Sequence, residues 1–332
     1  MELSILNQSP VLKNHSVEQS LKNTIDLALE AEHLGYKRYF VSEHHNMDKL
    51  IGTSPEVLVS HLAAHTNTIH IGAGGIMLSH HNPFHVAEQF QLINHLAPGR
   101  IDLGVGKAPG GTPTATHALQ SELRKDIDSF NTRFTSLKNY LNNTHEDHHS
   151  LKVSPDTSSP PELFLLGGSV ESAEFAASEG VNYIFAHFIN NDIKLLKQVV
   201  DAYRNQSENG TLIVALSAIV TEDDETKQRI KKENQYYQLS FENGRKLRVL
   251  TQKQVDNFLE NSGEDIQVKR RQAKIILGSQ QEVIETLSEL NNDKQIDEFM
   301  LHLPTTDAEI RLNTVQSLAP AHINNYQKAG VQ

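Results

Sequence analysis

The sequence predicts an α/β protein that folds as a (β/α)8 TIM barrel with a helical insertion after strand 7. Two observations lead to this prediction. Stretches with strand character alternate with helical patterns along the 332 residues, and eight such stretches can be counted. A closed barrel needs eight strands and typically about 250 residues, so the excess length fits one inserted segment. A doubly wound open sheet is the alternative, because the order of elements does not reveal closure.

The first half of the chain shows the alternation most clearly. Residues 2–7 have strand character, and Ser16 begins a helix because Gln19 stands at the third position of a capping box. The helix ends at Gly35, and residues 36–42 form the second strand, an order that requires parallel pairing. The next predicted elements are a helix from Ser54, a strand at 69–77, a helix at 83–96, a strand at 100–105, a loop at 106–117 and a helix at 119–141.

The second half continues the pattern after a polar connection at 142–161. The predicted elements are strands at 162–166, 182–188, 211–220 and 297–303, with helices at 169–179, 192–206, 280–290 and 307–327. The segment 221–278 is charged, helix-prone and out of step with the repeat, so we interpret it as an insertion within a single domain spanning 1–332.

Composition narrows the class of protein. Lys and Arg number 30 against 41 Asp and Glu, a net charge of −11, which argues against a nucleic-acid partner. The chain has no cysteine, so thiolate catalysis, disulfides and Cys-ligated metals are excluded. The N-terminal residues show no secretion signal and no apolar run is long enough for a membrane span, so we expect a cytoplasmic enzyme without a membrane partner.

The segment Ser42-Glu43-His44-His45-Asn46 directly follows the second strand. Because side chains alternate along an extended chain, Glu43 and His45 should face one way and His44 the other. The carboxyl ends of the strands are where a barrel places its chemistry, so these residues are candidates for proton transfer. The alternative is a solvated, histidine-rich loop, since the chain has 18 His.

Three glycine-rich strand ends are candidates for ligand contact. Gly74-Gly75 leaves no side chain in the way, which suits a flat ring or merely a tight bend. Gly106-Lys107 lacks the residues of a nucleotide-binding fingerprint, so it is either a strand exit with one cation or only a turn. Gly167-Gly168-Ser169 leads into a helix whose first amides suit a phosphate; the alternative is that Ser169 serves only as the N-cap.

A metal site is a further alternative, because His80 and His81 follow the third strand and could join His44 and His45. A barrel hydrolase would carry His-x-His on the first strand and acids on later strands. The first strand has neither histidine, so no metal is predicted.

Together the motifs resemble the luciferase-like monooxygenases, the flavin-dependent barrel family. The resemblance covers nearly the whole chain except the charged insertion. The motifs that carry it are Ala31-Glu32, Gly35-Tyr36, Arg38-Tyr39, Glu43-His44-His45, Pro55-Glu56, Gly72, Gly74-Gly75, Ala87-Glu88-Gln89, Pro98-Gly99-Arg100, Asp102-Leu103-Gly104, Lys107-Ala108-Pro109-Gly110 and Leu165-Leu166-Gly167-Gly168-Ser169.

The resemblance implies FMN binding at the carboxyl ends of the strands, with a cis peptide at Gly74-Gly75 beneath the flavin. It assigns the phosphate to Lys107 and the helix start. The implied cofactor-binding residues are Gly74, Gly75, Gly106, Lys107, Gly168, Ser169, Val170, Glu171, Ser172 and His187. The family often has Arg at Lys107 and, in some members, an aromatic residue at His187. Luciferase itself has a cysteine where this chain has Gly106, so light emission is not expected.

The implied reaction is oxygenation of a small organic substrate by reduced FMN and O₂. His44 is the predicted acid/base residue, with Glu43 or His45 orienting it. FMN would arrive as a diffusible co-substrate from a separate flavin reductase, and the family suggests a homodimer built on the second and third helices. The alternatives are a barrel that binds flavin without turnover, a deazaflavin-dependent dehydrogenase and a metal hydrolase.

Overall fold

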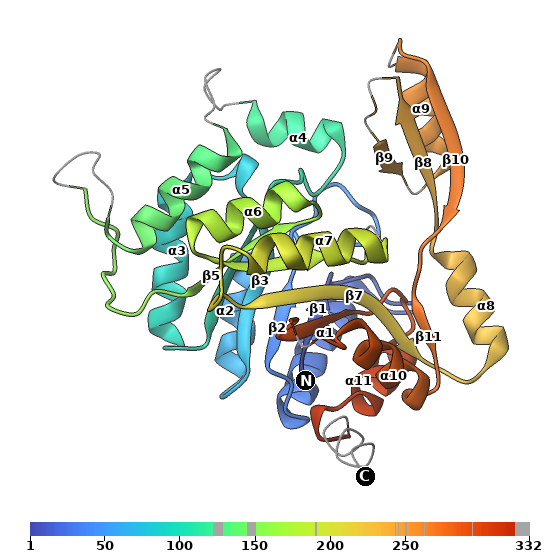
Figure 1. Ribbon diagram of the computed structural model, residues 1–332, viewed down its shortest axis with the longest axis horizontal. Coiled ribbons are helices and arrows are strands. Elements are labelled where there is room, and N and C mark those ends of the chain that lie inside the picture. Colours follow the sequence, from blue (N-terminus) through green and yellow to red (C-terminus); the bar gives the residue numbers. More distant parts are fainter. Residues whose placement is uncertain are drawn as a thin grey trace.

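The computed structural model describes residues 1–121, 129–144, 151–189, 191–242, 244, 246–249, 251–261, 263–293 and 295–322. Eight parallel strands close into a barrel, because β12 pairs with β1 and β6 pairs with β7 (Figure 1). The barrel strands are β1 (Glu2–Asn7), β2 (Arg38–Val41), β3 (His70–Met77), β4 (Ile101–Gly106), β5 (Glu162–Gly167), β6 (Asn182–Ala186), β7 (Leu212–Val220) and β12 (Glu298–His302). The predicted barrel is confirmed, and the open sheet is excluded.

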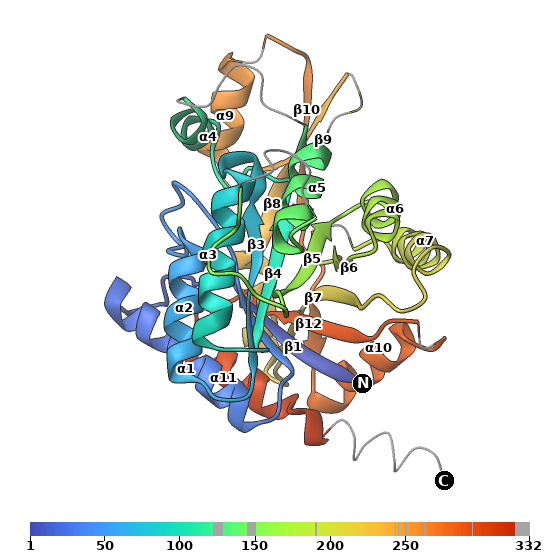
Figure 2. The same ribbon diagram turned by 90° about the vertical axis from the view of Figure 1, so that its left-hand side faces the viewer.

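Helices surround the barrel on its outer side (Figure 2). The predicted capping box is present, with Ser16 and Gln19 bonding each other's backbone amides at the start of α1. The helices that follow barrel strands are α1 (Val17–His33), α2 (Pro55–His65), α3 (Pro83–Leu96), α5 (Phe130–Leu141), α6 (Val170–Glu179), α7 (Ile193–Arg204), α10 (Gln280–Leu290) and α11 (Ala308–Ser317).

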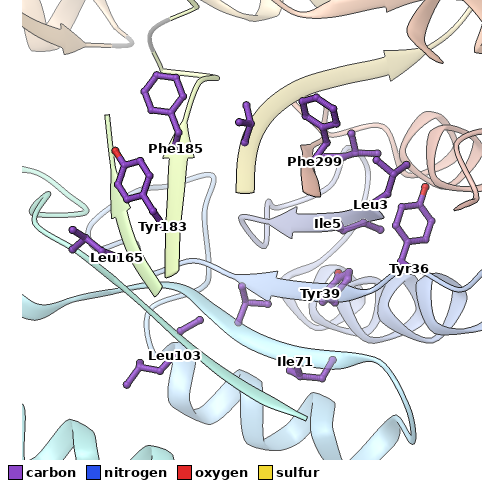
Figure 3. Packing of buried hydrophobic residues seen from close by; sticks show 14 of the residues in the cluster. Leu3, Ile5, Tyr36, Tyr39, Ile71, Leu103, Leu165, Tyr183, Phe185 and Phe299 are labelled. Carbon is purple, nitrogen blue, oxygen red and sulfur yellow. The ribbon is translucent and has the colours of Figure 1, made fainter. Parts of the chain in front are cut away.

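The main core lies between the barrel and its helices. Outward-facing strand residues such as Leu3, Tyr39 and Phe185 are fully buried there (Figure 3). Each fully buried large apolar side chain contributes about 1.5–3 kcal/mol relative to exposure. The alternation of side chains along each strand leaves the neighbouring residues for the barrel interior.

The barrel interior holds a second apolar layer, whose members come from six strands. It consists of Leu6, Phe40, Phe164, Ile184, Ile213, Ala215 and Met300. Glycines make room for it, since a Cβ at Gly72 would lie 2.4 Å from a ring carbon of Phe40. The interior below the strand ends is therefore filled by side chains and is not a channel.

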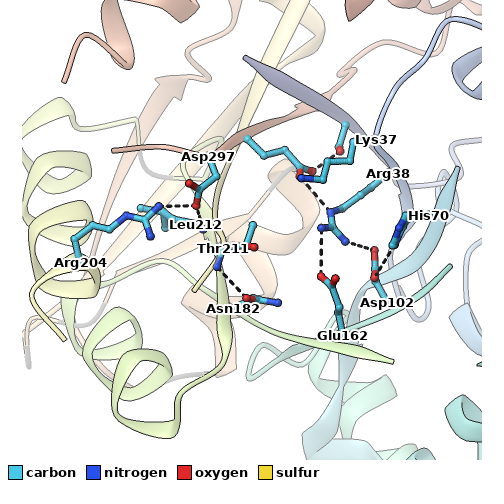
Figure 4. Close-up of polar contacts among 12 residues, drawn as sticks. Lys37, Arg38, His70, Asp102, Glu162, Asn182, Arg204, Thr211, Leu212 and Asp297 are labelled. Carbon is cyan, nitrogen blue, oxygen red and sulfur yellow. Dashed lines mark hydrogen bonds and ion pairs between the residues drawn. The ribbon is translucent and has the colours of Figure 1, made fainter. Parts of the chain in front are cut away.

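A charged cluster closes the amino-terminal end of the barrel (Figure 4). The Arg38 guanidinium contacts Asp102 at 2.6 Å, Glu298 at 3.1 Å and Glu162 at 3.3 Å. Asp102 and Glu298 are fully buried. Burial opposes the charge of Arg38, but the three carboxylates outweigh that effect and raise its pKa. One guanidinium thus ties four strands together.

The insertion between β7 and α10 differs from the helical segment that was predicted. It contains α8 (Asp224–Glu233) and α9 (Gln252–Asn261), but also the antiparallel sheet β10-β8-β9. The strands are β8 (Gln235–Phe241), β9 (Lys246–Val249) and β10 (Ile266–Gln272), followed by β11 (Ile276–Gly278), which pairs with β7. Leu239 and Phe241 alternate along β8 and pack into a small core of their own, a period-2 signal hidden among charged residues.

The helix predicted at 119–141 is also wrong in its extent. Thr112 caps a separate helix, α4 (Pro113–Gln120), and Ser129 caps α5. Each cap residue accepts a hydrogen bond from an amide three residues on. The predicted loop at 106–117 is therefore wrong in its second half, where α4 begins, and α5 begins only at Phe130. The predicted stretch at 122–128, and the end of the final predicted helix at 323–327, lie outside the described residues.

No helix among the described residues is both long and apolar enough to cross a membrane.

Replacing Arg38 with Ala should remove the guanidinium from the buried carboxylates of Asp102 and Glu298, which would keep only His70 and Lys37 as possible cationic neighbours. We expect the free energy of unfolding, measured by urea denaturation, to fall by about 3–5 kcal/mol. Lys22→Ala, which breaks the exposed pair of Lys22 with Asp26, is the matched control and should leave the denaturation midpoint essentially unchanged. Equal losses in the two variants would contradict a structural role for the Arg38 cluster.

Candidate active site

The ends of adjacent barrel strands bring the predicted residues to one rim. In the sheet register Met77 lies beside Gly106, Gly106 beside Leu166, and Gly167 beside Phe185. Because all eight strands are parallel, the segments that follow them emerge on the same face. The exits of β2 to β6, which carry the predicted proton-transfer and cofactor-binding residues, therefore form one continuous arc.

Glu43 is the buried centre of this arc, with no exposed surface. Its carboxylate lies 2.7 Å from His45 Nε2 and 2.8 Å from His81 Nε2, and it accepts a hydrogen bond from the amide of Met77 at 2.8 Å. Burial alone would raise the pKa of Glu43, but these hydrogen bonds outweigh burial and lower it. Glu43 is therefore a carboxylate at neutral pH.

His81 is the titratable partner of that carboxylate. Burial lowers the pKa of His81, but the hydrogen bond and charge of Glu43 outweigh it and raise the pKa above the usual 6.5. The sequence singled out His81 only as a metal ligand. Its pairing with Glu43 follows from the adjacency of β2 and β3, since the two residues follow neighbouring strands.

Among the described residues the Glu43 carboxylate bonds His45 and not His44, in agreement with the predicted alternation. His44 Nδ1 lies 3.1 Å from the Ser42 hydroxyl, and the His44 amide donates to the carbonyl of Gly52. Burial, partly opposed by the charge of Glu43, lowers the pKa of His44 to about 4. The predicted orienting role of Glu43 or His45 is therefore not seen, because Ser42 holds the imidazole and Glu43 binds His45 and His81.

The loop after β4 is hydrogen-bonded to residues that follow β2 and β3. The amide of His45 donates to Gly110, His80 Nε2 lies 2.8 Å from the carbonyl of Pro109, and Asn46 donates to the Thr112 hydroxyl. These bonds hold the loop that carries Lys107. The Lys107 side chain is exposed, and within the described chain it makes no ion pair.

The two glycine motifs are built for close approach. The Gly74–Gly75 peptide is cis, and a Cβ at Gly75 would meet the carbonyl oxygen of Gly104 at 2.8 Å. Gly106 follows on the neighbouring strand, where a Cβ would meet only the sulfur of Met77 at 3.7 Å. Backbone without side chains therefore lines this part of the rim.

The amino end of α6 lies next in the arc. Ser169 and Ser172 form a capping box, so both serines serve the helix. A Cβ at Gly168 would meet nothing within 4 Å, so the chain directly before the helix is not crowded at that position. Glu171 is exposed, and a hydrogen bond from the Ser169 side chain lowers its pKa. The predicted N-cap at Ser169 is confirmed, and phosphate binding at this helix end stays a prediction.

His187 and a second polar group lie further round the rim. His187 is buried directly after β6, with its ring 5.6 Å from that of Phe185. His302, at the end of β12, bonds the Ser217 hydroxyl and Gln8. Sequence reasoning missed both His302 and Ser217. The rule that selected Glu43, a polar residue at a strand's carboxyl end, would have found His302, but Ser217 lies inside the apolar run of β7.

The described residues contain no group of three or more ligating side chains that could hold a metal ion. The histidines considered as metal ligands are engaged elsewhere, since His81 binds Glu43 and His80 binds the loop at Pro109.

Comparison with known proteins identifies the family of this chain. The model of a family described as luciferase-like monooxygenase matches residues 1–294. The chain belongs to the luciferase-like monooxygenase family. The resemblance expected from the motifs is confirmed, and the protein is an enzyme of a family whose named relatives are monooxygenases.

Individual relatives agree over nearly the whole chain. An N-acetyl-S-alkylcysteine monooxygenase of Bacillus subtilis (strain 168) is 37% identical to this chain. The match covers 97% of this chain and 98% of the length of that enzyme. The crystal structure of apo-MsnO8 has a TM-score of 0.77 and 28% identity, covering 96% of this chain and 98% of that one. A type II Baeyer–Villiger monooxygenase of Pseudomonas putida in complex with FMN, 16% identical with a TM-score of 0.66 over 98% of both chains, shares the fold.

The Glu43–His81 pair makes stability depend on pH, and Glu43→Gln should remove that dependence. Glu43 stabilises fully above its usual pKa of 4.5, and this contribution is lost as pH falls through its lowered folded pKa. His81 stabilises fully below 6.5, and its contribution is lost as pH rises through its raised folded pKa. The wild type should exceed the variant most between about pH 4.5 and 6.5, by on the order of 1–3 kcal/mol in urea denaturation. A constant difference across pH would refute the pairing.

Proposed function

We propose that the chain is a flavin-dependent monooxygenase that uses reduced FMN and O₂ to oxygenate a small organic substrate. One observation carries the proposal. The histidine-rich exit of β2, a side-chain-free stretch of backbone and the amino end of α6 lie along one arc of the barrel rim. Family membership and an FMN-bound protein of the same fold support it.

The rim fits a planar ring that bears a phosphate. Lys107 is an exposed cation, and the amides at the start of α6 carry the positive end of the helix dipole. We infer that Lys107 and the backbone of Ser169, Val170, Glu171 and Ser172, reached past Gly168, hold the phosphate. Gly74, Gly75 and Gly106 would face the ring, with His187 at its edge. A lysine binds phosphate as a point charge, less rigidly than an arginine fork.

His44 is the residue proposed to exchange a proton with the substrate. Its pKa of about 4 makes it neutral at physiological pH, so it is available as a base. Ser42 holds Nδ1, which leaves Nε2 for proton exchange. The His45 amide bonds the loop that carries Lys107, and Glu43 bonds the His45 ring, so both are positioning residues. Bound FMN supplies the redox chemistry, and the protein positions and shields it.

The insertion is proposed to limit access of water. It projects beside the barrel mouth, as Figure 1 shows, and follows β7 directly. We propose that it acts as a lid within a single domain spanning 1–332, since covering the mouth is the usual way a barrel excludes solvent.

The substrate and partners follow from the relatives and the surface. Because the B. subtilis relative is named for N-acetyl-S-alkylcysteine, we propose a small thioether as the substrate class. We further propose a cytoplasmic enzyme supplied with FMN by a separate reductase. A homodimer through α2 and α3 would cover Val57, Leu92 and Leu96, which are 63%, 53% and 69% exposed.

His44→Ala and Lys107→Ala should separate chemistry from binding. His44→Ala should bind oxidised FMN as the wild type does but lose substrate-dependent turnover by about 10²–10⁴-fold, the usual contribution of a positioned acid or base. Lys107→Ala should instead weaken FMN binding. In the wild type, turnover should fall as pH drops through about 4, because His44 then becomes protonated.

Fluorescence titration with FMN and oxygen consumption with reduced FMN measure these two effects. Unchanged turnover in His44→Ala would remove the acid/base assignment. FMN binding without any substrate-dependent turnover in the wild type would favour the non-catalytic binder, and tighter binding of a deazaflavin would favour the dehydrogenase.

A further inference from the structure

The other half of the barrel mouth, formed by β6, β7, β12 and β1, carries a polar group that the proposed flavin site does not use. His302 and Gln8 stand at the carboxyl ends of β12 and β1, and Ser217 lies three residues before the end of β7, in three strands that are side by side. In the register His302 is beside both Ser217 and Leu6. We call these three residues the mouth triad.

Alternation directs the triad into the barrel. Ser217 has the parity of Ala215, His302 that of Met300, and Gln8 that of Leu6, and the three apolar residues belong to the buried interior layer. The triad therefore lies one step above that layer, at the level where the interior opens. Gln8 and His302 are partly exposed there.

Hydrogen bonds fix the triad as a unit. His302 Nδ1 lies 3.0 Å from the Ser217 hydroxyl, and His302 Nε2 lies 2.9 Å from Gln8 Oε1. The His302 ring also rests 5.0 Å from the ring of Phe188, which packs against the interior layer. Both ring nitrogens are thus engaged, and the imidazole is held by three strands and one aromatic ring.

A purely structural role does not explain this composition. The layer directly below contains only apolar side chains, and polar groups in a protein interior cost free energy unless their hydrogen bonds are made. Apolar residues at the three positions would close the barrel without that cost. Polar side chains placed on an apolar layer at the mouth of a barrel are instead typical of a site that orients a ligand.

The hydrogen-bonding groups of the triad that have no partner in the described part of the chain indicate which chemical group such a ligand carries. When Gln8 Oε1 accepts from His302, the two N–H groups of the Gln8 carboxamide are still available, and no partner holds them among the described residues. A partly buried pair of donors fits an acceptor oxygen. The neighbouring Phe188 ring and the interior layer suit an apolar chain.

We propose that the mouth triad is a specificity site that binds a carbonyl oxygen, of a carboxylate or an amide, at one end of the organic substrate. Gln8 donates to that oxygen, while His302 and Ser217 hold Gln8 in place and are positioning residues. The apolar end of the substrate lies along Phe188. This inference rests on the proposed function, since it assigns the substrate side of the same mouth.

Calorimetric titration with N-acetyl-S-methylcysteine, with and without FMN, tests the assignment in three variants. Gln8→Met keeps the length of the side chain and removes its donors, and His302→Phe keeps a ring and removes both nitrogens. His70→Phe is the matched control, because His70 is a partly buried ring bonded to Asp102 at the other end of the barrel. The methyl ester and the N-acetyl thioether without a carboxylate separate the two kinds of oxygen, and butyl methyl sulfide lacks both.

Gln8→Met should bind the acid about ten- to a hundredfold more weakly, and His302→Phe should also bind it more weakly. The His70→Phe control should match the wild type, and butyl methyl sulfide should bind alike to all four proteins. If the variant no longer prefers the acid over its methyl ester, the bound oxygen belongs to a carboxylate. If the acid, the ester and the N-acetyl thioether all lose affinity equally, the bound oxygen belongs to the amide.

Wild-type affinity for the acid in Gln8→Met would overturn the proposal. So would a wild type that binds butyl methyl sulfide as well as the acid, or a parallel loss of FMN affinity in both triad variants. Failure of the wild type to bind FMN would instead refute the flavin proposal, and the titration without FMN would still test the triad.

Discussion

Closure of eight parallel strands is the constraint on which the rest of the structure depends. The pairing of β12 with β1 and of β6 with β7 removes every free edge of the barrel and sends all strand exits to one face. Strand alternation then divides the side chains between the helix-facing core and the interior. Glu43, the Gly74–Gly75 peptide and the amino end of α6 are brought together by this geometry and not by proximity in the chain.

The buried carboxylates at the two ends of the barrel have different partners. At the amino-terminal end, the Arg38 guanidinium contacts the fully buried carboxylates of Asp102 and Glu298, and His70 is a further neighbour of Asp102. At the mouth, Glu43 is also fully buried, but two of its partners are histidines. A guanidinium keeps its charge at any physiological pH, whereas an imidazole does not. The closed end is therefore suited to stability, and the mouth to proton exchange.

Much of the fold could be predicted from the sequence because its signals are local. The capping box at Ser16, the proline at the start of α3 and the apolar run of β7 each identify an element without reference to the rest of the chain. The insertion was harder, since its strands bury only one face and its charged residues resemble those of an exposed helix. The alternating apolar residues of β8 become informative only once the small core they share with α9 is known.

Candidate site residues could be predicted wherever they stand in a contiguous motif. His44, Lys107 and Ser169 fall in such motifs, and the structure brings their segments to one rim. Contacts between separate segments could not be predicted. His81 bonds Glu43 although the two residues follow different strands, and His302 bonds Gln8 although 294 positions separate them. Pairings of this kind depend on strand order and register, which one sequence does not contain.

The most direct test of the central claim, that one arc of the rim holds a phosphate-bearing flavin, is a crystal structure of the protein soaked with FMN. The account predicts the phosphate within hydrogen-bonding distance of Lys107 and the first amides of α6, with the ring against Gly74–Gly75. An FMN bound away from that arc, or a phosphate that contacts neither Lys107 nor α6, would contradict it.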